Sequence, residues 1–252
     1  MKISYIPNRL ECKYILDVAT LFKVEQYLED LRLVKDEYSE NGFYTVNSVY
    51  FDTPSLYDYY AKEAGLLKRK KLRARIYKDR FDNPKTVWLE LKKKHNLSIM
   101  KERIVLKGDE WQKLLNRDTT YFLDLLKQEE QNPETSKALK EFMFHYVKGS
   151  YKPIAYVQYK RKAYLARFTS PMRITIDKDI RAQRFGSITE SEGPIFTNIN
   201  KNEAVLEVKF NGRVPWWFKD MVGRFCLKRT TFSKYNLSVN ALRNEIGLPL
   251  NK

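Results

Sequence analysis

The segment GLLKRKKLRARIY, residues 65–77, is the most informative stretch of the sequence. From residue 69 onward its odd positions are cations, namely Arg69, Lys71, Arg73 and Arg75. The even positions from 72 onward are apolar: Leu72, Ala74 and Ile76. Because successive side chains of a β-strand point to opposite faces, residues 69–77 are predicted to form a strand with one basic and one apolar face.

Seven other segments show the same contrast between a charged and an apolar face. They are Arg9–Tyr14, Ser48–Asp52, Val87–Lys92, Lys101–Leu106, Ile154–Leu165, Arg173–Asp177 and Ala204–Lys209. The charged face of a single strand normally meets solvent. Eight such strands fit a closed antiparallel barrel better than an open sheet with a charged, solvent-facing side. A barrel of eight strands is large enough to hold one small ligand. The charged faces would then turn inward, and the apolar faces would pack against helices.

Helical patterns occupy the segments between these strands. The predicted helices are 18–33, 110–128, 137–147, 216–225 and 236–246. The first has the apolar spacing of an amphipathic helix, the fourth follows Pro215, and the last ends at Gly247. No linker or internal repeat interrupts the chain. The predicted fold is therefore α+β, an eight-stranded antiparallel β-barrel with surrounding helices, in a single domain over residues 1–252.

The composition excludes several classes of protein. The 252 residues include 47 Lys+Arg against 31 Asp+Glu, a formal net charge of +16, and 43% are hydrophobic, which supplies a core and argues against extended disorder. Two cysteines and two histidines supply neither a disulfide framework nor a four-cysteine or histidine-rich metal site. No apolar run approaches the ~18–20 residues of a membrane helix, and the N-terminus does not resemble a signal peptide. A cytoplasmic protein with an anionic partner is expected.

Familiar catalytic motifs are missing from the sequence. It contains no GxxxxGK[ST] phosphate loop, no GxGxxG, no GxSxG nucleophile elbow and no HExxH. Ser233 and Cys226 have no evident neighbouring base, which gives nucleophilic catalysis little support. The charges of both signs on the strand faces must therefore carry the function.

Short charged blocks follow one another along nearly the whole chain. They are RLECKY (9–14), SVYFDT (48–53), GLLKRKKLRARIY (65–77), LELKKK (89–94), YKRKAY (159–164), RITID (173–177), LEVKF (206–210) and SKY (233–235). Together and in this order they resemble the VTC domain, the polyphosphate polymerase domain of the triphosphate tunnel metalloenzyme (CYTH-like) superfamily. The resemblance implies a tunnel of eight antiparallel strands that binds a triphosphate or a longer phosphate chain. This agrees with the inward-facing charges deduced from the strand pattern.

The resemblance also implies which residues act. Matching motif positions gives the phosphate-binding set Lys13, Arg73, Arg75, Lys92, Lys101, Arg161, Arg173 and Lys234. The members assigned to catalysis are Arg73, Arg75, Lys92, Arg161 and Lys234. Phosphoryl transfer depends mainly on positioning and charge stabilisation. Lysine and arginine neutralise phosphate charge, and arginine can bind phosphate bidentately.

A divalent metal, Mn²⁺ or Mg²⁺, is implied as cofactor, because such ions prefer carboxylate oxygens. Glu207 is the best ligand candidate, and Glu11 and Glu90 are weaker ones; Glu90 is also suited to pairing with cations across the sheet. The superfamily carries ExExK on its first strand, whereas this sequence has Arg9 in place of the first glutamate. Fewer carboxylates weaken the activation of a metal-bound water, which favours polymerisation over hydrolysis.

The leading hypothesis is a polyphosphate polymerase that transfers the γ-phosphate of ATP to a growing polyphosphate chain and releases ADP. An inorganic or nucleoside triphosphatase of the same fold and a non-catalytic polyphosphate-binding module are the alternatives. Nucleic acid is disfavoured as a partner, because no aromatic residue interleaves the basic row before Tyr77. A separately encoded membrane partner and the oligomeric state stay open.

The tunnel assignment also predicts the behaviour of two variants. Arg73→Ala or Lys234→Ala is expected to abolish binding of the phosphate chain and to leave the protein folded. If these cations are unpaired in a crowded positive tunnel, removing one relieves repulsion and raises stability.

Overall fold

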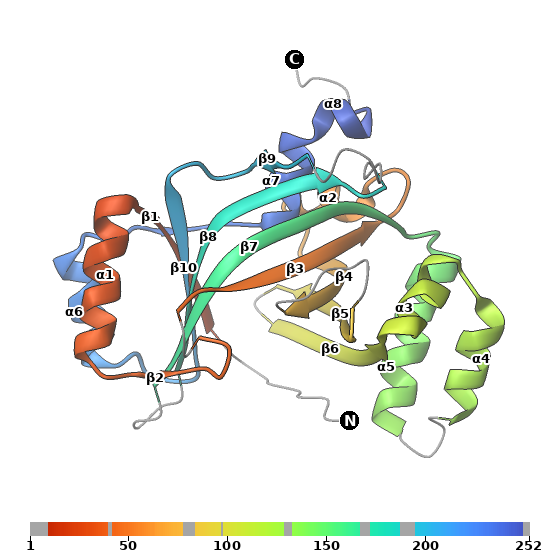
Figure 1. The fold of residues 1–252 in the computed structure, drawn as a ribbon, viewed down its shortest axis with the longest axis horizontal. Helices are drawn as coiled ribbons and strands as arrows, with labels where there is room; N and C mark the ends of the chain where they lie inside the picture. Colours follow the sequence, from red (N-terminus) through yellow and green to blue (C-terminus); the bar gives the residue numbers. More distant parts are fainter. Residues whose placement is uncertain are drawn as a thin grey trace.

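The computed structural model describes residues 10–39, 42–77, 84–96, 98–128, 133–166, 172–186 and 195–248. One antiparallel sheet forms the centre of the molecule, and helices flank it at both ends (Figure 1). Its strands are β1 (Leu10–Asp17), β2 (Val34–Lys35), β3 (Tyr44–Asp52), β4 (Lys68–Tyr77), β5 (Thr86–His95), β6 (Ser98–Lys107), β7 (Lys152–Ala166), β8 (Met172–Arg184), β9 (Thr197–Asn198), β10 (Glu203–Phe210) and β11 (Arg229–Thr230). All eight predicted strands are confirmed, and β2, β9 and β11 are short additions.

The sheet curls so that strands far apart in its order meet through their side chains. The hydrogen-bonded order is β11-β1-β10-β8-β7-β3-β4-β5-β6. Within the described segments, no backbone pairing joins β6 to β11. However, the Lys92 ammonium on β5 lies 3.2 Å from the Glu11 carboxylate on β1, although five strands separate β1 from β5 in this order. The tunnel is therefore closed at this point by side chains.

The helices agree with the predicted segments, with one addition. They are α1 (Val18–Asp30), α2 (Tyr57–Glu63), α3 (Gly108–Leu115), α4 (Thr119–Gln128), α5 (Pro133–Met143), the π-helical turn η1 (Phe144–Lys148), α6 (Trp216–Arg224), α7 (Lys234–Ala241) and α8 (Arg243–Ile246). The predicted helix 110–128 is divided into α3 and α4, and 236–246 into α7 and α8. Helix α2 is the addition. No helix in the described part of the chain is both long and apolar enough to cross a membrane.

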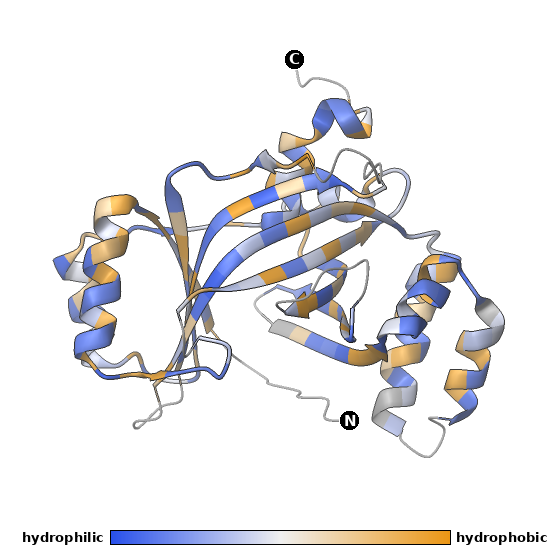
Figure 2. Ribbon diagram, viewed as in Figure 1, coloured by the Kyte–Doolittle hydropathy of each residue, from blue (hydrophilic) through white to orange (hydrophobic). Residues whose placement is uncertain are grey.

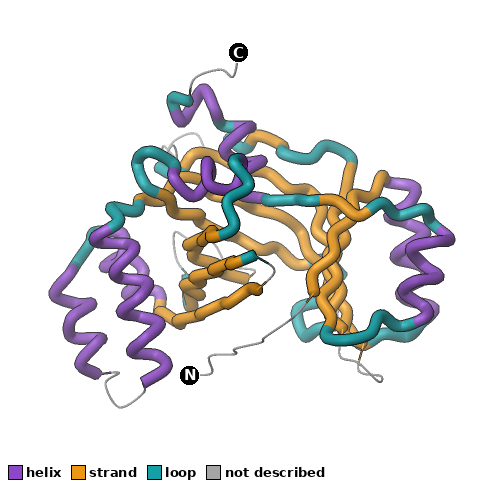
Figure 3. The backbone as a smooth tube through the Cα atoms, turned by 180° about the vertical axis from the view of Figure 1, so that it is seen from behind, coloured by secondary structure: helices purple, strands orange, loops and turns teal. Residues whose placement is uncertain are grey.

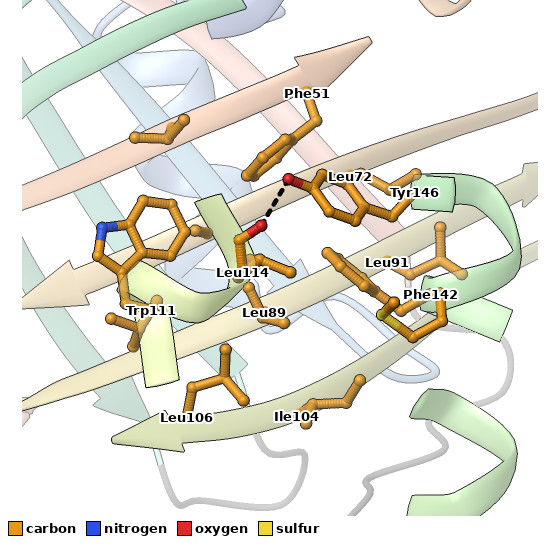
Figure 4. Packing of buried hydrophobic residues seen from close by; sticks show 14 of the residues in the cluster. Phe51, Leu72, Leu89, Leu91, Ile104, Leu106, Trp111, Leu114, Phe142 and Tyr146 are labelled. Atoms are coloured by element: carbon orange, nitrogen blue, oxygen red, sulfur yellow. Dashed lines mark hydrogen bonds between the residues drawn. The ribbon is translucent and has the colours of Figure 1, made fainter. Parts of the chain in front are cut away.

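The outward faces of the strands form two apolar layers against helices. Figure 2 shows the strands alternating between hydrophobic and hydrophilic residues along their length. One layer packs β4, β5 and β6 against α3, α5 and η1 (Figure 4). There Phe51 contacts Trp111, Phe142 and Tyr146 edge to face, and the Tyr146 hydroxyl donates to the Leu114 carbonyl at 2.8 Å. Helices α1 and α6 cover β1, β8 and β10 in the same way. The expected outward apolar packing is confirmed.

The inward, concave face is only partly charged. Helix α7 packs against it, and Tyr235 stacks on Tyr50 with ring centroids 5.3 Å apart. Phe232 and Val239 join the same apolar cluster with Tyr159. In Figure 3 the strands form the middle of the molecule and the helices lie around it. Burial of apolar surface therefore anchors α7 on the concave face, beside the charged side chains.

Candidate functional site

Glu90 is the centre of the first charge cluster on the concave face. In the strand register, Arg73 of β4 and Arg103 of β6 lie opposite Glu90 of β5 on either side. Arg73 Nε lies 2.5 Å from one carboxylate oxygen, and Arg103 Nη2 and Lys101 Nζ lie 2.7 and 2.5 Å from the other. Arg75 Nη1 is 4.0 Å away. Since Glu90 is only 1% exposed, four cations surround one buried carboxylate.

These cations set the protonation state of Glu90. Burial alone would raise its pKa, but the charges of Arg73, Lys101, Arg75 and Arg103 hold the pKa of Glu90 well below its ordinary value. The carboxylate is therefore ionised at neutral pH, and cations engage both of its oxygens. Glu90 is therefore suited to act as a counterion that holds the arginine side chains in position. Of the three predicted metal ligands, Glu90 is the least suited to bind a metal, because four cations surround it, whereas Glu11 and Glu207 each contact two lysines.

Asp177 of β8 is the centre of a second cluster, and sequence reasoning assigned it no role. Arg161 Nε and Nη2 donate to its two oxygens at 2.6 and 2.7 Å, and Lys234 Nζ donates to one of them at 2.6 Å. Burial opposes ionisation, but Arg161 and Lys234 hold the pKa of Asp177 below its ordinary value. The available signal was its position in the RITID block, two residues after Thr175 on the same strand face.

Tyr159 of β7 connects these two clusters. Its hydroxyl accepts a hydrogen bond from Arg75 Nη2 at 3.0 Å. Lys234 Nζ and the Arg161 guanidinium lie 4.6 and 5.2 Å from the centre of its ring. Together with Arg73, which binds Glu90, four of the five predicted catalytic cations therefore belong to one continuous network.

Lys92, the fifth predicted catalytic cation, lies in a third cluster. There Lys13 Nζ lies 3.2 Å from Glu11 and 3.4 Å from Glu207, and Lys92 Nζ lies 3.2 Å from the other oxygen of Glu11. Lys209 also binds Glu207. Burial and mutual repulsion oppose ionisation of the two carboxyls. The lysines nevertheless lower the pKa of Glu11 to about 2 and that of Glu207 well below its ordinary value.

A cavity of about 330 Å³ opens beside this third cluster. Residues of β1, β4, β5 and the segment 229–233 line it together with Lys62 of α2, and we call it the cationic cavity. Eight of its fourteen lining residues are lysine or arginine, and one, Glu11, is acidic. An excess of one charge in a cleft concentrates ligands of the opposite charge. The cationic cavity is therefore suited to a polyanion.

Arg173, a predicted phosphate ligand, lies outside the network around Tyr159. Its Nη2 donates to Asp36 Oδ2 at 2.9 Å, and the Tyr44 hydroxyl donates to the same oxygen at 3.3 Å. Arg173 precedes Asp177 by four residues on β8, roughly 13 Å along the strand. The structure thus brings together seven of the eight predicted phosphate ligands in three clusters and places Arg173 apart.

Arg73 and Lys234 are paired cations. Arg73 binds Glu90, and Lys234 binds Asp177. Removing either cation takes one partner away from a buried carboxylate, which is unfavourable. The premise that these cations are unpaired is therefore wrong, and we expect Arg73→Ala and Lys234→Ala to be less stable than the parent protein.

The family model of the VTC domain matches residues 8–243. The chain belongs to the VTC domain family. The resemblance drawn from the charged blocks is confirmed, and with it the α+β tunnel fold. Arg9, the residue that replaces a superfamily glutamate, lies outside the described residues. A comparison with curated proteins finds no match.

Solved structures of similar arrangement share little sequence with this VTC domain. The HpAC1 protein from Hippeastrum, described as having a dominant triphosphatase activity, is 14% identical with a TM-score of 0.48; the match covers 96% of this chain and 98% of that one. The PH1819 protein from Pyrococcus horikoshii is 12% identical with a TM-score of 0.46, and the match covers 94% and 99%.

Membership of the VTC domain family supports an enzyme of the triphosphate tunnel class that works on triphosphate or polyphosphate, and this fold implies a divalent metal. Among the described residues, no group of three or more Asp, Glu, His or Cys side chains could hold a metal by itself. Glu11 and Glu207 lie near one another on either side of Lys13 Nζ, and each has two lysine partners, so a metal held by both carboxylates would replace part of this pairing. Mg²⁺ in phosphate-transfer sites is typically bound by one or two carboxylates together with substrate phosphates.

Proposed function

We propose that this VTC domain is a polyphosphate polymerase that transfers the γ-phosphate of ATP to the end of a polyphosphate chain. The extent of the cation network supports this most directly. It runs from Arg161 and Arg75, which contact Tyr159, to the cationic cavity. On β4 alone, the row from Lys71 to Arg75 spans about 13 Å. A site of this length suits a chain of phosphates.

In the proposed reaction, a terminal oxygen of the chain attacks the γ-phosphorus of ATP, and the bond from that phosphorus to the ADP oxygen breaks. Arg73 and Arg75, held by Glu90, and Arg161, held by Asp177, supply fixed donors for the phosphate oxygens. Donors that are already in place stabilise developing charge without reorganisation. A divalent cation held by Glu207 and Glu11 would, when bound, neutralise part of the phosphate charge.

The protonation of the carboxylates supports polymerisation over hydrolysis. Activation of water by a carboxylate requires that its pKa lie near the working pH. Burial opposes ionisation of Glu90 and Asp177, yet their cationic neighbours keep the pKa of both well below the ordinary value. Both are therefore weak bases whose oxygens already bind arginines. An attacking polyphosphate oxygen carries its own negative charge and needs no such base.

The test is incubation of the purified protein with γ-labelled ATP and either Mn²⁺ or Mg²⁺, followed by gel separation of the products. We expect a ladder of labelled polyphosphate with release of ADP. Glu207→Gln should lower the rate by about 10²-fold or more, because it removes the carboxylate charge that would hold the metal and that pairs with Lys13 and Lys209. The matched control is Glu203→Gln, at the exposed end of the same strand, which should leave the rate unchanged.

Other products would assign a different function. Free orthophosphate without a ladder would make the protein a triphosphatase. No turnover, with polyphosphate still bound, would leave a binding module.

A further inference from the structure

Lys71 of β4 lines the cationic cavity, and the motif comparison gave it no role. Its Nζ lies 2.5 Å from Ser233 Oγ and 3.1 Å from Asn236 Oδ1, both of them neutral oxygens at the start of α7. Asn236 is fixed in turn, because its Nδ2 donates to the Tyr59 carbonyl at 3.1 Å and to Glu63 at 3.0 Å. In the part of the chain that the structure describes, no carboxylate forms an ion pair with Lys71.

The surroundings of Lys71 are mainly positive. The groups that face it or line the same cavity are Lys13 and Glu11 (β1), Lys92 and Lys94 (β5), Lys62 and Glu63 (α2), Arg69 and Lys70 (β4), Arg229 (β11) and Tyr235 (α7). Glu11 already binds two lysines, and Glu63 binds Asn236. Burial first, and then the nearby cations, lower the pKa of Lys71 to about 7.

This environment leaves one position on the Lys71 nitrogen for a ligand. A neutral amine has two N–H donors, which Ser233 and Asn236 can accept, and one lone pair. An ammonium has three donors. A neutral Lys71 limits repulsion among the cavity cations, whereas a phosphate chain would bring the opposite charge and favour the ammonium.

We infer that Lys71 is a further phosphate ligand, which takes up a proton from solvent when a polyphosphate chain fills the cationic cavity. The proton binds to the lone pair of Nζ, and the new N–H donates to a phosphate oxygen. The bonds to Ser233 and Asn236 remain. This inference rests on the proposed function, since it requires that the cavity binds a phosphate chain.

The experiment is calorimetric titration with long-chain sodium polyphosphate, without metal, in two buffers of different ionisation enthalpy at pH 6 and pH 8. The difference in heat gives the number of protons taken up. Lys71→Arg is the comparison, because arginine keeps the charge and does not titrate in this range. With the pKa of Lys71 at about 7, the wild type should take up about 0.9 proton more than Lys71→Arg at pH 8 and about 0.1 more at pH 6. The ligand's own titration cancels between the two proteins.

Two further variants separate a specific role from a general loss of charge. Lys71→Met should bind polyphosphate about tenfold more weakly than the wild type at pH 6, since it removes one charged hydrogen bond. Lys127→Met removes an exposed lysine on α4 and should match the wild type in affinity and proton uptake. Thermal unfolding of each variant checks that it is folded.

Equal proton uptake by the wild type and Lys71→Arg at pH 8 would overturn the inference. If both proteins still bound and extended polyphosphate, the proposed function would stand without it. If the wild type bound no polyphosphate, the proposed function would fail, and the role of Lys71 with it.

Discussion

The Glu90 and Asp177 clusters and the cationic cavity share one concave face, but they balance charge in opposite ways. In the clusters, each buried carboxylate is surrounded by arginine and lysine side chains, most of them within 3 Å. In the cavity, eight cations accompany one acidic residue. The first arrangement holds arginines in fixed positions, and the second leaves positive charge available to an incoming ligand.

This difference indicates a division of labour along the tunnel. Excess positive charge attracts a polyanion over a distance that depends on ionic strength. Arginines that carboxylates already hold lose little freedom when they meet phosphate. We therefore expect the cavity to capture the chain and the two clusters to position it. The predictions below test this division.

The largest effect should follow from removing the central carboxylate of the first cluster. Glu90→Gln leaves the buried Arg75 and the partly buried Arg73 without their carboxylate counterion. Breaking a buried ion pair by removing one partner is expected to lower the free energy of unfolding by about 3–5 kcal/mol. Chemical denaturation of the variant and the parent protein measures this.

Glu102→Gln is the matched control for this variant. Glu102 lies on the neighbouring strand β6, is partly exposed, and binds Lys93 at 2.9 Å. Its loss should change stability by no more than about 1 kcal/mol. If Glu90→Gln were as stable as Glu102→Gln, the clusters would not depend on their buried carboxylates, and the contrast with the cavity would disappear.

A smaller effect is expected at Asp58 of α2, beside the cavity residue Lys70. Asp58 is buried and accepts a hydrogen bond from the Tyr151 hydroxyl at 2.7 Å. Burial, and then the charge of Asp52, raise the pKa of Asp58 from 3.8 to about 6. This is opposite to the clusters, where cations lower carboxyl pKa values, because among the described residues Asp58 forms an ion pair with one cation, Lys70, at 3.5 Å.

The sign of the resulting pH dependence follows from this raised pKa. Between about pH 4 and 6 the folded protein holds a proton on Asp58 that the unfolded chain has lost, so stability falls as pH rises through this window. The loss is about 3 kcal/mol at most. Asp58→Asn should remove this part of the pH dependence. Unfolding free energies at pH 4.5 and 7.5 measure it, and equal pH dependence in both proteins would contradict it.

The strands and their two faces could be predicted from sequence because their signal is local. An alternation of period 2 is visible in Arg69–Tyr77 without knowledge of the rest of the chain. Helix α2 could not be predicted this way. It begins after Leu56, which has a left-handed backbone, and the Asp52 side chain accepts hydrogen bonds from the Asp58 and Tyr59 amides. That carboxylate is held in turn by Tyr235, distant in sequence.

Which residues pair with one another in the site is decided by contacts between segments that are distant in sequence, and no local sequence pattern shows these contacts. The sequence identified Arg73 and Glu90 as candidates, but their ion pair follows from the β4–β5 register. The role of Asp177 comes from Lys234, 57 residues away. Motif matching passed over Lys71, because its distinguishing feature is that no carboxylate in the described part of the chain forms an ion pair with it. The single domain over residues 1–252 and the cytoplasmic location stay predictions.

The smallest effects on stability should come from the cavity itself. In the double variant Arg69→Met/Lys94→Met, two cavity cations are removed that no carboxylate of the described chain binds. Because repulsion is relieved and little packing is lost, unfolding free energy should change by no more than about 0.5 kcal/mol. Polyphosphate binding should weaken by about three- to tenfold at low salt. The difference in affinity between the variant and the parent should shrink at high salt, because screening weakens the contribution that Arg69 and Lys94 make in the parent.

Lys127→Met/Lys219→Met, which removes two exposed lysines on α4 and α6, should bind as the parent does. Equal loss in both double variants would mean that net charge, and not the cavity, captures the chain. A large loss of stability in the cavity variant would mean that its cations are structural, like those around Glu90.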